Sequence, residues 1–516
     1  MAHTANFWSK IDHIVVLMLE NRSFDNLLGW LYDPANDAPY NVVPSDFDGL
    51  SGKSLSNPAL DGQPIPVGKT DDPYSPQPDP GEPYEDVYSQ MYNVPLLDIL
   101  RIPPAPPYPP NMQGFIRNYA AQKIAPVNAA IIMNSLTPKS LPVLSALAHH
   151  YALCDRWFAS VPTQTFCNRS FVHAGTSSGY VNNAGGGPCF VNDTTTIFDL
   201  LEAAGRTWNI FCGGWLLESF SLLTQKHLWQ YALTPHFAHF KDFVAAAKNG
   251  TLPNYSFIEP IYFDSPVWGP HNDMHPECNA IKIFGPSNLH RGEALLWTIY
   301  DAIFNGPSWK DTLFIILFDE HGGCYDHVPP PSPTDTCRCP VACLPDRTIP
   351  AGEQGFSGFQ FDRLGPRVPA IIISAYTPPQ TRLHDVFEHT SILSTIVNCF
   401  ELPGGQLGNR QEKAQDLSAA VSLAAPRPNS VSIEKPHFSL IEDLKSELHQ
   451  LAHSRLLGAH EKPCSDLQKH ALHGVALFTQ STGLHGRIDS IKNELEAGLL
   501  LVEHEAKLVR RKFFND

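Results

Sequence analysis

Residues 312–324, TLFIILFDEHGGC, form an apolar run that stops at two adjacent carboxylates, Asp319 and Glu320. A run rich in Ile and Phe with such an ending is typical of a buried strand that carries acids at its carboxyl end. In open parallel sheets, ligands bind outside this edge. Because neighbouring carboxylates repel each other unless a cation or proton lies between them, the pattern predicts a metal ion at this strand end.

The same pattern occurs near the N-terminus, where the strand-like run His13–Leu19 is followed by Glu20 and Asn21. Carboxylate and amide oxygens suit one divalent ion, with Ca²⁺, Zn²⁺, Mn²⁺ and Mg²⁺ as the candidates. Glu20 has an alternative role, as a cap of the next helix or as the partner of Arg22. Acids at two strand ends favour one shared metal site over two unrelated caps.

The composition predicts a large folded core connected by long, stiff loops, since the 516 residues are 43% hydrophobic and include 47 prolines. A net charge of −16 argues against nucleic acid as a partner and against broad docking on anionic membranes, but it does not exclude lipid as a substrate. No apolar run approaches the roughly 20 residues of a membrane span. No signal peptide is visible at the start, which favours a cytoplasmic location unless a leader was removed.

Strand-like and helix-like segments alternate along the chain, which predicts a layered α/β fold with a mainly parallel central sheet flanked by helices. Further predicted strands are Trp208–Cys212, Tyr255–Ile258 and Ala370–Ala375, and predicted helices are 141–153, Thr196–Ala204, His236–Lys248 and Glu293–Phe304. We expect residues 1–431 to form the catalytic domain, with 33–112 as a long loop or lid beside a pocket. Residues 432–516 are expected to be a helical appendage that packs on the core, self-associates into an oligomer or contacts a partner.

A candidate nucleophile lies in the segment 160–169, SVPTQTFCNR, which precedes a helix-like stretch at 170–177. Amides at a helix N-terminus attract anions such as phosphate. A nearby divalent cation lowers the pKa of a hydroxyl such as that of Thr165, which makes it a nucleophile. Asn168 and Arg169 offer donors to phosphate oxygens. The alternative is that Thr165 is an ordinary helix cap.

Four motifs occur in a familiar order: ENRSFD at 20–25, Thr165-x-x-Asn168-Arg169, DEHGG with DHV at 319–328, and GPRVP at 365–369. Together they resemble the phosphoesterase family that contains bacterial phospholipases C, plant non-specific phospholipases C and a group of acid phosphatases. The similarity extends from about residue 11 to 405 and leaves the tail after 432 uncovered. It implies an alkaline-phosphatase-like α/β fold.

The resemblance implies specific roles for matching residues. Glu20 and Asn21 match the first pair of metal ligands, Asp319 and Glu320 match the second pair, and Thr165 matches the hydroxyl nucleophile that also touches the metal. His275, in NDMHP at 272–276, resembles the family's histidine near the scissile phosphate, where an imidazole protonates the leaving alkoxide or helps bind the phosphoryl group. His321 and His389 are further candidates for binding substrate.

The chain departs from the family pattern at three positions that are expected to lie near substrate. Relatives often have proline at the position of Cys167, and many have histidine at the position of Glu82, after Asp-Pro-Gly. A second histidine after the His275 motif is also missing, and Ser287 stands near its place. These changes leave hydrolysis plausible and the substrate class open.

A competing motif lies at 343–347, CLPDR, which fits the Cys-x-Pro-x-Arg core of sulfatases. It follows the Asp319-Glu320 strand instead of preceding it, and no helix-like segment follows it, so a sulfatase is disfavoured. Cys343 also clusters with Cys337 and Cys339. A zinc ion there would lack a fourth ligand at ordinary spacing, which favours a disulfide or an inert loop.

The function expected from these residues is metal-dependent hydrolysis of phosphoric esters, with Thr165 as nucleophile and a phosphothreonine intermediate. The preferred substrate is a phospholipid diester, as in phospholipases C. The alternatives are an acid phosphatase acting on soluble monoesters and a non-catalytic protein that binds phosphate or lipid.

Overall fold

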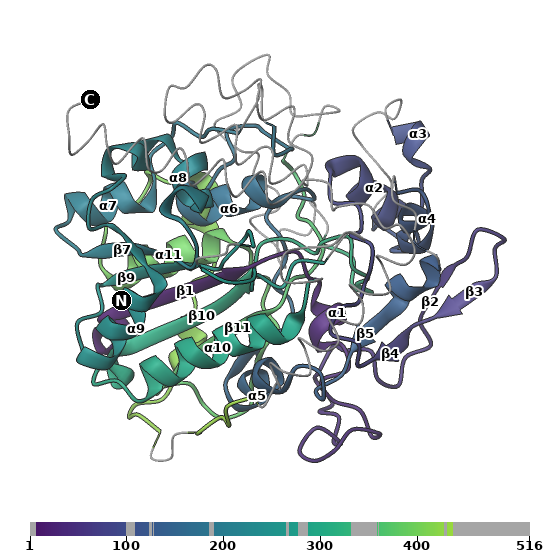
Figure 1. Ribbon diagram of the computed structural model, residues 1–516, viewed down its shortest axis with the longest axis horizontal. Helices are drawn as coiled ribbons and strands as arrows, with labels where there is room; N and C mark the ends of the chain where they lie inside the picture. The colour runs from purple at the N-terminus through teal and green to yellow at the C-terminus, as the bar shows by residue number, and fades with distance from the viewer. Residues whose placement is uncertain are drawn as a thin grey trace, which may run out of the picture.

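A single eight-stranded sheet organises the protein in the computed structural model, which describes residues 7–99, 109–122, 126, 128–184, 190–264, 268–276, 287–331, 359, 361–427 and 431–436. In spatial order the strands are β12 (Thr381–Leu383), β6 (Ala152–Cys154), β11 (Ala370–Ser374), β10 (Thr312–Phe318), β1 (His13–Leu19), β9 (Tyr255–Glu259), β7 (Trp208–Cys212) and β8 (Phe237–His239). Figure 1 shows β1 and β10 side by side at the centre of the sheet.

The sheet is mainly parallel, because β11 alone runs antiparallel to both of its neighbours, β10 and β6. All residues of β10 and all of β1 after His13 are buried. Such continuous burial requires cover on both faces of the sheet, which explains why these strands are uniformly apolar and not alternating. The predicted layered fold is confirmed.

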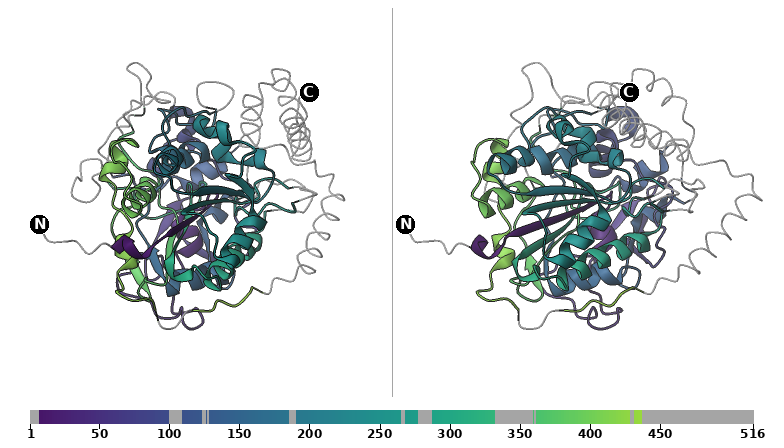
Figure 2. Two further views of the ribbon diagram at one scale, coloured as in Figure 1. Left: turned by 90° about the vertical axis from the view of Figure 1, so that its left-hand side faces the viewer. Right: turned by 60° about the vertical axis from the view of Figure 1, so that its left-hand side comes forward.

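Helices cover both faces of the sheet (Figures 1 and 2). One face carries α5 (Pro142–His150), α9 (Phe240–Asn249) and α10 (Leu289–Phe304), and the other carries α6 (Thr165–Ala174), α7 (Ile197–Ala203), α8 (Phe220–Thr224) and α11 (Thr390–Cys399). In the described residues outside the segment 24–136, the remaining helices are α12 (Gly408–Lys413) and the 3-10 helices η1 (Phe7–Lys10), η3 (Leu216–Glu218), η4 (Lys226–Tyr231), η5 (Trp309–Asp311) and η7 (Ser418–Val421).

The segment predicted as a loop or lid, 33–112, contains regular structure. With its neighbours it comprises α1 (Phe24–Leu28), β2 (Ser56–Pro58), β3 (Pro64–Pro66), β4 (Gly68–Thr70), α2 (Tyr84–Tyr92), α3 (Leu96–Ile99), α4 (Phe115–Ala120), η2 (Ala129–Met133) and β5 (Asn134–Leu136). In α2, Tyr84, Val87, Tyr88 and Met91 are buried at helical spacing, a pattern that the surrounding prolines obscured. The expectation of an irregular segment was therefore wrong, and the role as a lid stays a prediction.

Most predicted elements agree with the structure. The helix expected at 170–177 is α6, which begins earlier, at Thr165, and the other differences lie at short strands. The helix predicted for 141–153 ends at His150, because Ala152–Cys154 pairs with β11 and β12 as β6. The first residues of the helix predicted for His236–Lys248 form β8 instead, paired with β7. Strand pairing with distant residues overrides local helical spacing at both places. The predictions for 437–516 and for Cys337, Cys339 and Cys343 lie outside the described residues.

A buried ion cluster ties three of the sequence motifs together behind the strand ends. The Arg367 guanidinium lies 2.9 Å from Asp25 and 2.9 Å from Asp326, and it stacks over the Phe24 ring at 4.4 Å. His327 Nδ1 lies 2.6 Å from Asp25 Oδ2. The guanidinium occupies the place between the carboxylates that a metal ion would need, so the cluster is structural. It fixes the segments that follow β1 and β10 to the one that precedes β11.

This cluster makes stability depend on pH. Burial alone would lower the pKa of His327, but Asp25 and Asp48 raise it to about 9. Since the pKa in the unfolded chain is roughly 6.5, the stabilisation is complete below that pH and is lost as the pH rises to about 9. We expect the wild-type protein to lose up to about 3 kcal/mol more unfolding free energy over this range than His327→Gln. Urea unfolding at both pH values measures the difference.

The control for this prediction is Asn249→Gln, at an exposed and uncharged side chain that ends α9. We expect this variant to follow the wild-type pH dependence, because it removes no titrating group. Equal losses of unfolding free energy in wild type and His327→Gln would contradict the assignment.

Candidate active site

The two acidic strand ends meet at one edge of the sheet, as predicted. Leu19 pairs with Phe318 in the parallel register of β1 and β10, so Glu20 and Asp319 are the next residues on neighbouring strands. The backbone N–H of Asn21 donates to Asp319 Oδ1 at 3.0 Å, and the Asn21 backbone is in the left-handed region at φ 54°. Glu20, Asn21, Asp319 and Glu320 are all buried. The structure thus brings the four predicted metal ligands together.

Thr165 lies beside this acidic edge. It is the first residue of α6, and its Oγ1 is 3.5 Å from Glu20 Oε2, a distance at the outer limit of a hydrogen bond. The α6 dipole places partial positive charge at the same point, which favours an anion there. The hydroxyl is therefore next to the predicted ligands, at a helix start that suits a phosphoryl group.

The loop before Thr165 is held by Asn168. Its Oδ1 accepts from Val161 N at 3.0 Å, and its Nδ2 donates to the carbonyl oxygens of Val161 and Thr163 at 3.2 and 2.8 Å. These contacts fix the position of Thr165 from one turn further along the helix. They favour a positioning role for Asn168, and its predicted contact with substrate stays a prediction.

Arg169 connects α6 to both strand ends. Its Nη2 donates to Glu20 Oε1, and its Nε lies 3.2 Å from Asp319 Oδ2. The guanidinium is buried and lies 5.3 Å from the centre of the Tyr262 ring. Arg169 thus neutralises part of the acidic charge. Its Nη1 has no hydrogen-bond partner among the described residues, which is the atom left for the predicted contact with substrate.

Two of the predicted metal ligands carry buried oxygen atoms without a hydrogen-bond partner in the described part of the chain. These atoms are Asn21 Oδ1 and Glu320 Oε1. Leaving a buried acceptor unsatisfied costs about 1–3 kcal/mol, and more for a charged group. A hard divalent cation takes carboxylate and amide oxygens as ligands, so it would satisfy both atoms. The residues present therefore fit one divalent cation.

Burial and mutual repulsion raise the pKa values of the acids at the strand ends. Burial raises the pKa of Glu20 well above its ordinary value, and Asp319 adds to the effect. Burial also raises the pKa of Glu320 well above its ordinary value, and the nearby carboxylates of Glu82 and Asp319 raise it further. Arg169 alone does not compensate these carboxylates. A cation bound among them would restore their charged form.

His275 lies on the other side of Asn21. The Asn21 Nδ2 is 2.9 Å from His275 Nε2, and it also donates to Glu82 Oε1, which lies 3.2 Å from the same ring nitrogen. Although burial lowers the pKa of His275, Asp79 and Glu82 raise it well above its ordinary value. The two carboxylates therefore favour the protonated form of the imidazole, which suits a proton donor.

His321 and His389 are buried and neutral. Burial lowers the pKa of each to about 3. His389 Nδ1 accepts from Trp157 Nε1 at 3.2 Å, so Nε2 carries the proton and donates to the Asp319 carbonyl at 2.6 Å. His321 Nε2 contacts Gln90 Oε1 at 2.7 Å. These contacts fix the acidic loop, and direct contact of either ring with substrate stays a prediction.

Two glycines allow three loops to pack together at the site. Gly322 has φ 61°, and a Cβ there would lie 2.0 Å from the Asn21 carbonyl oxygen. Gly323 has φ 63°, and its Cβ would lie 2.7 Å from the Gly81 carbonyl oxygen. Only glycine combines this backbone conformation with such close approach. The GG of DEHGG is therefore explained by the approach of segments 20–21 and 79–82.

Sequence reasoning missed the contributions of Asp79, Glu82 and Gln90 to the site. The sequence marks Glu82 only as a departure from the family pattern, yet its carboxylate contacts both Asn21 and His275. The available signal was a Pro-Gly turn with an acid on each side, directly before the helix that begins at Tyr84. Ser287, the third departure, has its Oγ 3.0 Å from His271 Nε2 and donates to the His275 carbonyl.

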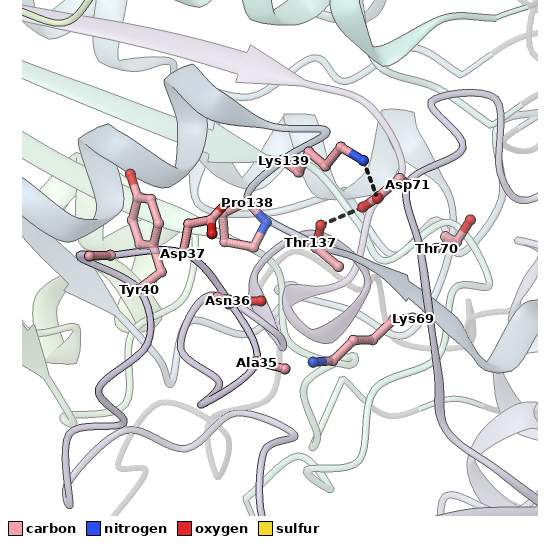
Figure 3. A pocket seen from close by; sticks show the side chains of 11 residues that line it. Ala35, Asn36, Asp37, Tyr40, Lys69, Thr70, Asp71, Thr137, Pro138 and Lys139 are labelled. Atoms are coloured by element: carbon pink, nitrogen blue, oxygen red, sulfur yellow. Dashed lines mark hydrogen bonds and ion pairs between the residues drawn. The ribbon is translucent and has the colours of Figure 1, made fainter.

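A separate cavity of about 430 Å³ lies in the segment 35–139 and contains none of the predicted site residues (Figure 3). Lys69 and Lys139, which line it, are paired with Asp33 at 2.7 Å and Asp71 at 3.2 Å. Because both lysines already have an acidic partner, neither is left as a free cation for a ligand in the cavity. The role of segment 33–112 as a lid beside the substrate stays a prediction.

An acidic site at the carboxyl edge of a mainly parallel sheet, beside a hydroxyl at a helix start, places the protein among the α/β enzymes whose ligands bind at strand ends. The chain belongs to the Phosphoesterase family, whose model matches residues 11–403. It is accordingly a hydrolase of phosphoric ester bonds.

Curated relatives match most of the chain. Non-specific phospholipase C3 of Arabidopsis thaliana is 34% identical over 81% of this chain and 75% of its own length. Non-specific phospholipase C1 of the same plant is 32% identical over 96% of this chain and 87% of its own length. Phospholipase C B of Mycobacterium tuberculosis (strain ATCC 25618 / H37Rv) is 26% identical over 84% and 82%.

Solved structures with some similarity include a protein in the alkaline phosphatase superfamily from Vibrio parahaemolyticus, with 12% identity and a TM-score of 0.30 over 63% of this chain and 83% of that one. A phosphonate monoester hydrolase from Silicibacter pomeroyi has 12% identity and a TM-score of 0.27 over 56% and 73%. Among the described residues, no helix combines the length and apolar character that a membrane span needs.

Proposed function

We propose that this protein is a phospholipase C-type phosphodiesterase that uses Thr165 as its nucleophile and one divalent cation as its cofactor. The observation that carries the proposal is the position of Thr165 Oγ1, 3.5 Å from Glu20, beside the unsatisfied oxygens of Asn21 and Glu320. The names of the curated relatives support a phospholipid diester as the substrate.

Glu20, Asn21, Asp319 and Glu320 would hold the cation, with Thr165 beside it. When bound, the cation supplies positive charge that lowers the pKa of the Thr165 hydroxyl and neutralises phosphoryl oxygens. Arg169 holds Glu20 and Asp319 in place by its two ion pairs. The partial positive charge of the α6 N-terminus attracts the phosphoryl group to the same point.

Thr165 Oγ1 then attacks phosphorus in line with the leaving alkoxide, and the bond to that alkoxide breaks. His275 donates its proton to the departing oxygen, which is the role expected of an imidazolium held by Glu82 and Asp79. Water then attacks the phosphothreonine and returns Thr165 to its hydroxyl form. Positioning and charge neutralisation supply most of the rate in such transfers.

A panel of three esters tests the proposed reaction: phosphatidylcholine in mixed micelles, bis(p-nitrophenyl) phosphate and p-nitrophenyl phosphate, each with added Ca²⁺, Zn²⁺, Mn²⁺ or Mg²⁺. We expect diacylglycerol and phosphocholine from the lipid, and faster turnover of the diester than of the monoester. Turnover of the monoester alone would identify a phosphatase. Metal retention without turnover of any ester would identify a binding protein and contradict the proposal.

A further inference from the structure

The site contains more acidic than basic groups. Its interacting charged groups include three basic side chains, Arg22, Arg169 and His275. They also include six carboxylates, those of Glu20, Asp79, Glu82, Asp273, Asp319 and Glu320. One divalent cation leaves this described part of the site with a negative balance. A substrate that adds two further negative charges is therefore less compatible with it than a substrate that adds one.

Glu82 lies beside His275, the proposed proton donor to the substrate. Its Oε1 is 3.2 Å from His275 Nε2 and accepts from Asn21 Nδ2. The carboxylate is nearly buried, so solvent screens it little. The Glu82 carboxylate also repels that of Glu320, which follows β10. A phosphoryl group held between Thr165 and His275 would thus lie close to a fixed negative charge that is additional to the predicted metal ligands.

We propose that Glu82 is a specificity-determining residue that selects phosphodiesters over phosphomonoesters by repelling the second negative charge of a monoester. The inference rests on the proposed function, since it assumes a phosphoryl group at this site. A diester carries one negative charge at neutral pH, whereas a monoester carries nearly two. Glu82 disfavours both, but it disfavours the monoester more, because the repulsion scales with the charge of the ligand.

Glu82→Gln tests the proposal, because glutamine retains the Oε1 that accepts from Asn21 and removes only the charge. We expect the ratio of kcat/KM for bis(p-nitrophenyl) phosphate to that for p-nitrophenyl phosphate to fall about tenfold or more. The matched control is Glu85→Gln, three residues further on, where the acid lies at the start of α2 and outside these contacts. We expect Glu85→Gln to keep the wild-type ratio.

A binding measurement gives a second readout that needs no turnover. In a Thr165→Ala background with added cation, we expect Glu82→Gln to tighten the binding of methyl phosphate about tenfold and to change that of dimethyl phosphate much less. Thermal unfolding of both variants confirms that they fold. An unchanged ratio and unchanged binding, with wild-type turnover intact, would overturn the role of Glu82. An absence of both turnover and phosphate-ester binding in wild type would instead overturn the proposed function.

Discussion

Thr165→Ala is expected to lower kcat for a phosphodiester by at least about a thousandfold, since the variant loses the attacking oxygen itself. KM should change far less, because Glu20, Arg169 and the α6 N-terminus remain in place. Steady-state kinetics with bis(p-nitrophenyl) phosphate and saturating cation measure the effect. The loss should persist at saturating cation, which separates a missing nucleophile from weaker metal binding.

The matched control for this change is Thr165→Ser, which keeps a hydroxyl at the start of α6. We expect it to retain activity within about tenfold of wild type, because serine serves as the same type of nucleophile. Full activity in Thr165→Ala would contradict the assigned role. So would equal losses in the alanine and serine variants, which would indicate that the threonine acts through its methyl group and packing.

Glu320→Gln is expected to weaken binding of the catalytic cation by at least about a hundredfold, because it removes a charged ligand and leaves a neutral amide. Glu320 Oε1 is buried and has no hydrogen-bond partner in the described part of the chain, and the proposed cation would be its partner. Elemental analysis after dialysis should give one divalent ion per wild-type chain and close to none in the variant. Activity should return only at high added cation.

Glu412→Gln, at an exposed acid on α12, serves as the control and should bind metal like wild type. The variant at Glu320 should also gain thermal stability in the absence of metal, because burial raises the pKa of that carboxyl and a neutral amide avoids the cost of a buried charge. Unchanged metal content in Glu320→Gln would contradict the ligand assignment.

The centre of the fold was predictable because strong local signals agree with the tertiary structure there. β1 and β10 begin and end at the residues where their apolar runs begin and end. Parallel pairing then places Glu20 beside Asp319, and this follows from the strand ends alone. Short strands such as Ala152–Cys154 were not predictable, because three residues acquire strand geometry only from distant partners.

The candidate site was predictable where a motif and a strand end coincide, and less so where loops meet. The position of Glu82 depends on Gly322 and Gly323. Because these residues have no side chains, the segment after β10 packs closely against both Asn21 and Gly81. Arg169 illustrates a second difficulty. Its type and spacing suit phosphate, yet the structure pairs it with Glu20 and Asp319, because burial of those acids favours a permanent cation between them.

The stereochemical course at phosphorus tests the central claim most directly. Attack by Thr165 followed by attack of water inverts the configuration twice, so hydrolysis of a chiral phosphorothioate diester in isotopically labelled water should proceed with overall retention. Net inversion would show that water attacks the substrate in a single step, and would contradict a phosphothreonine intermediate.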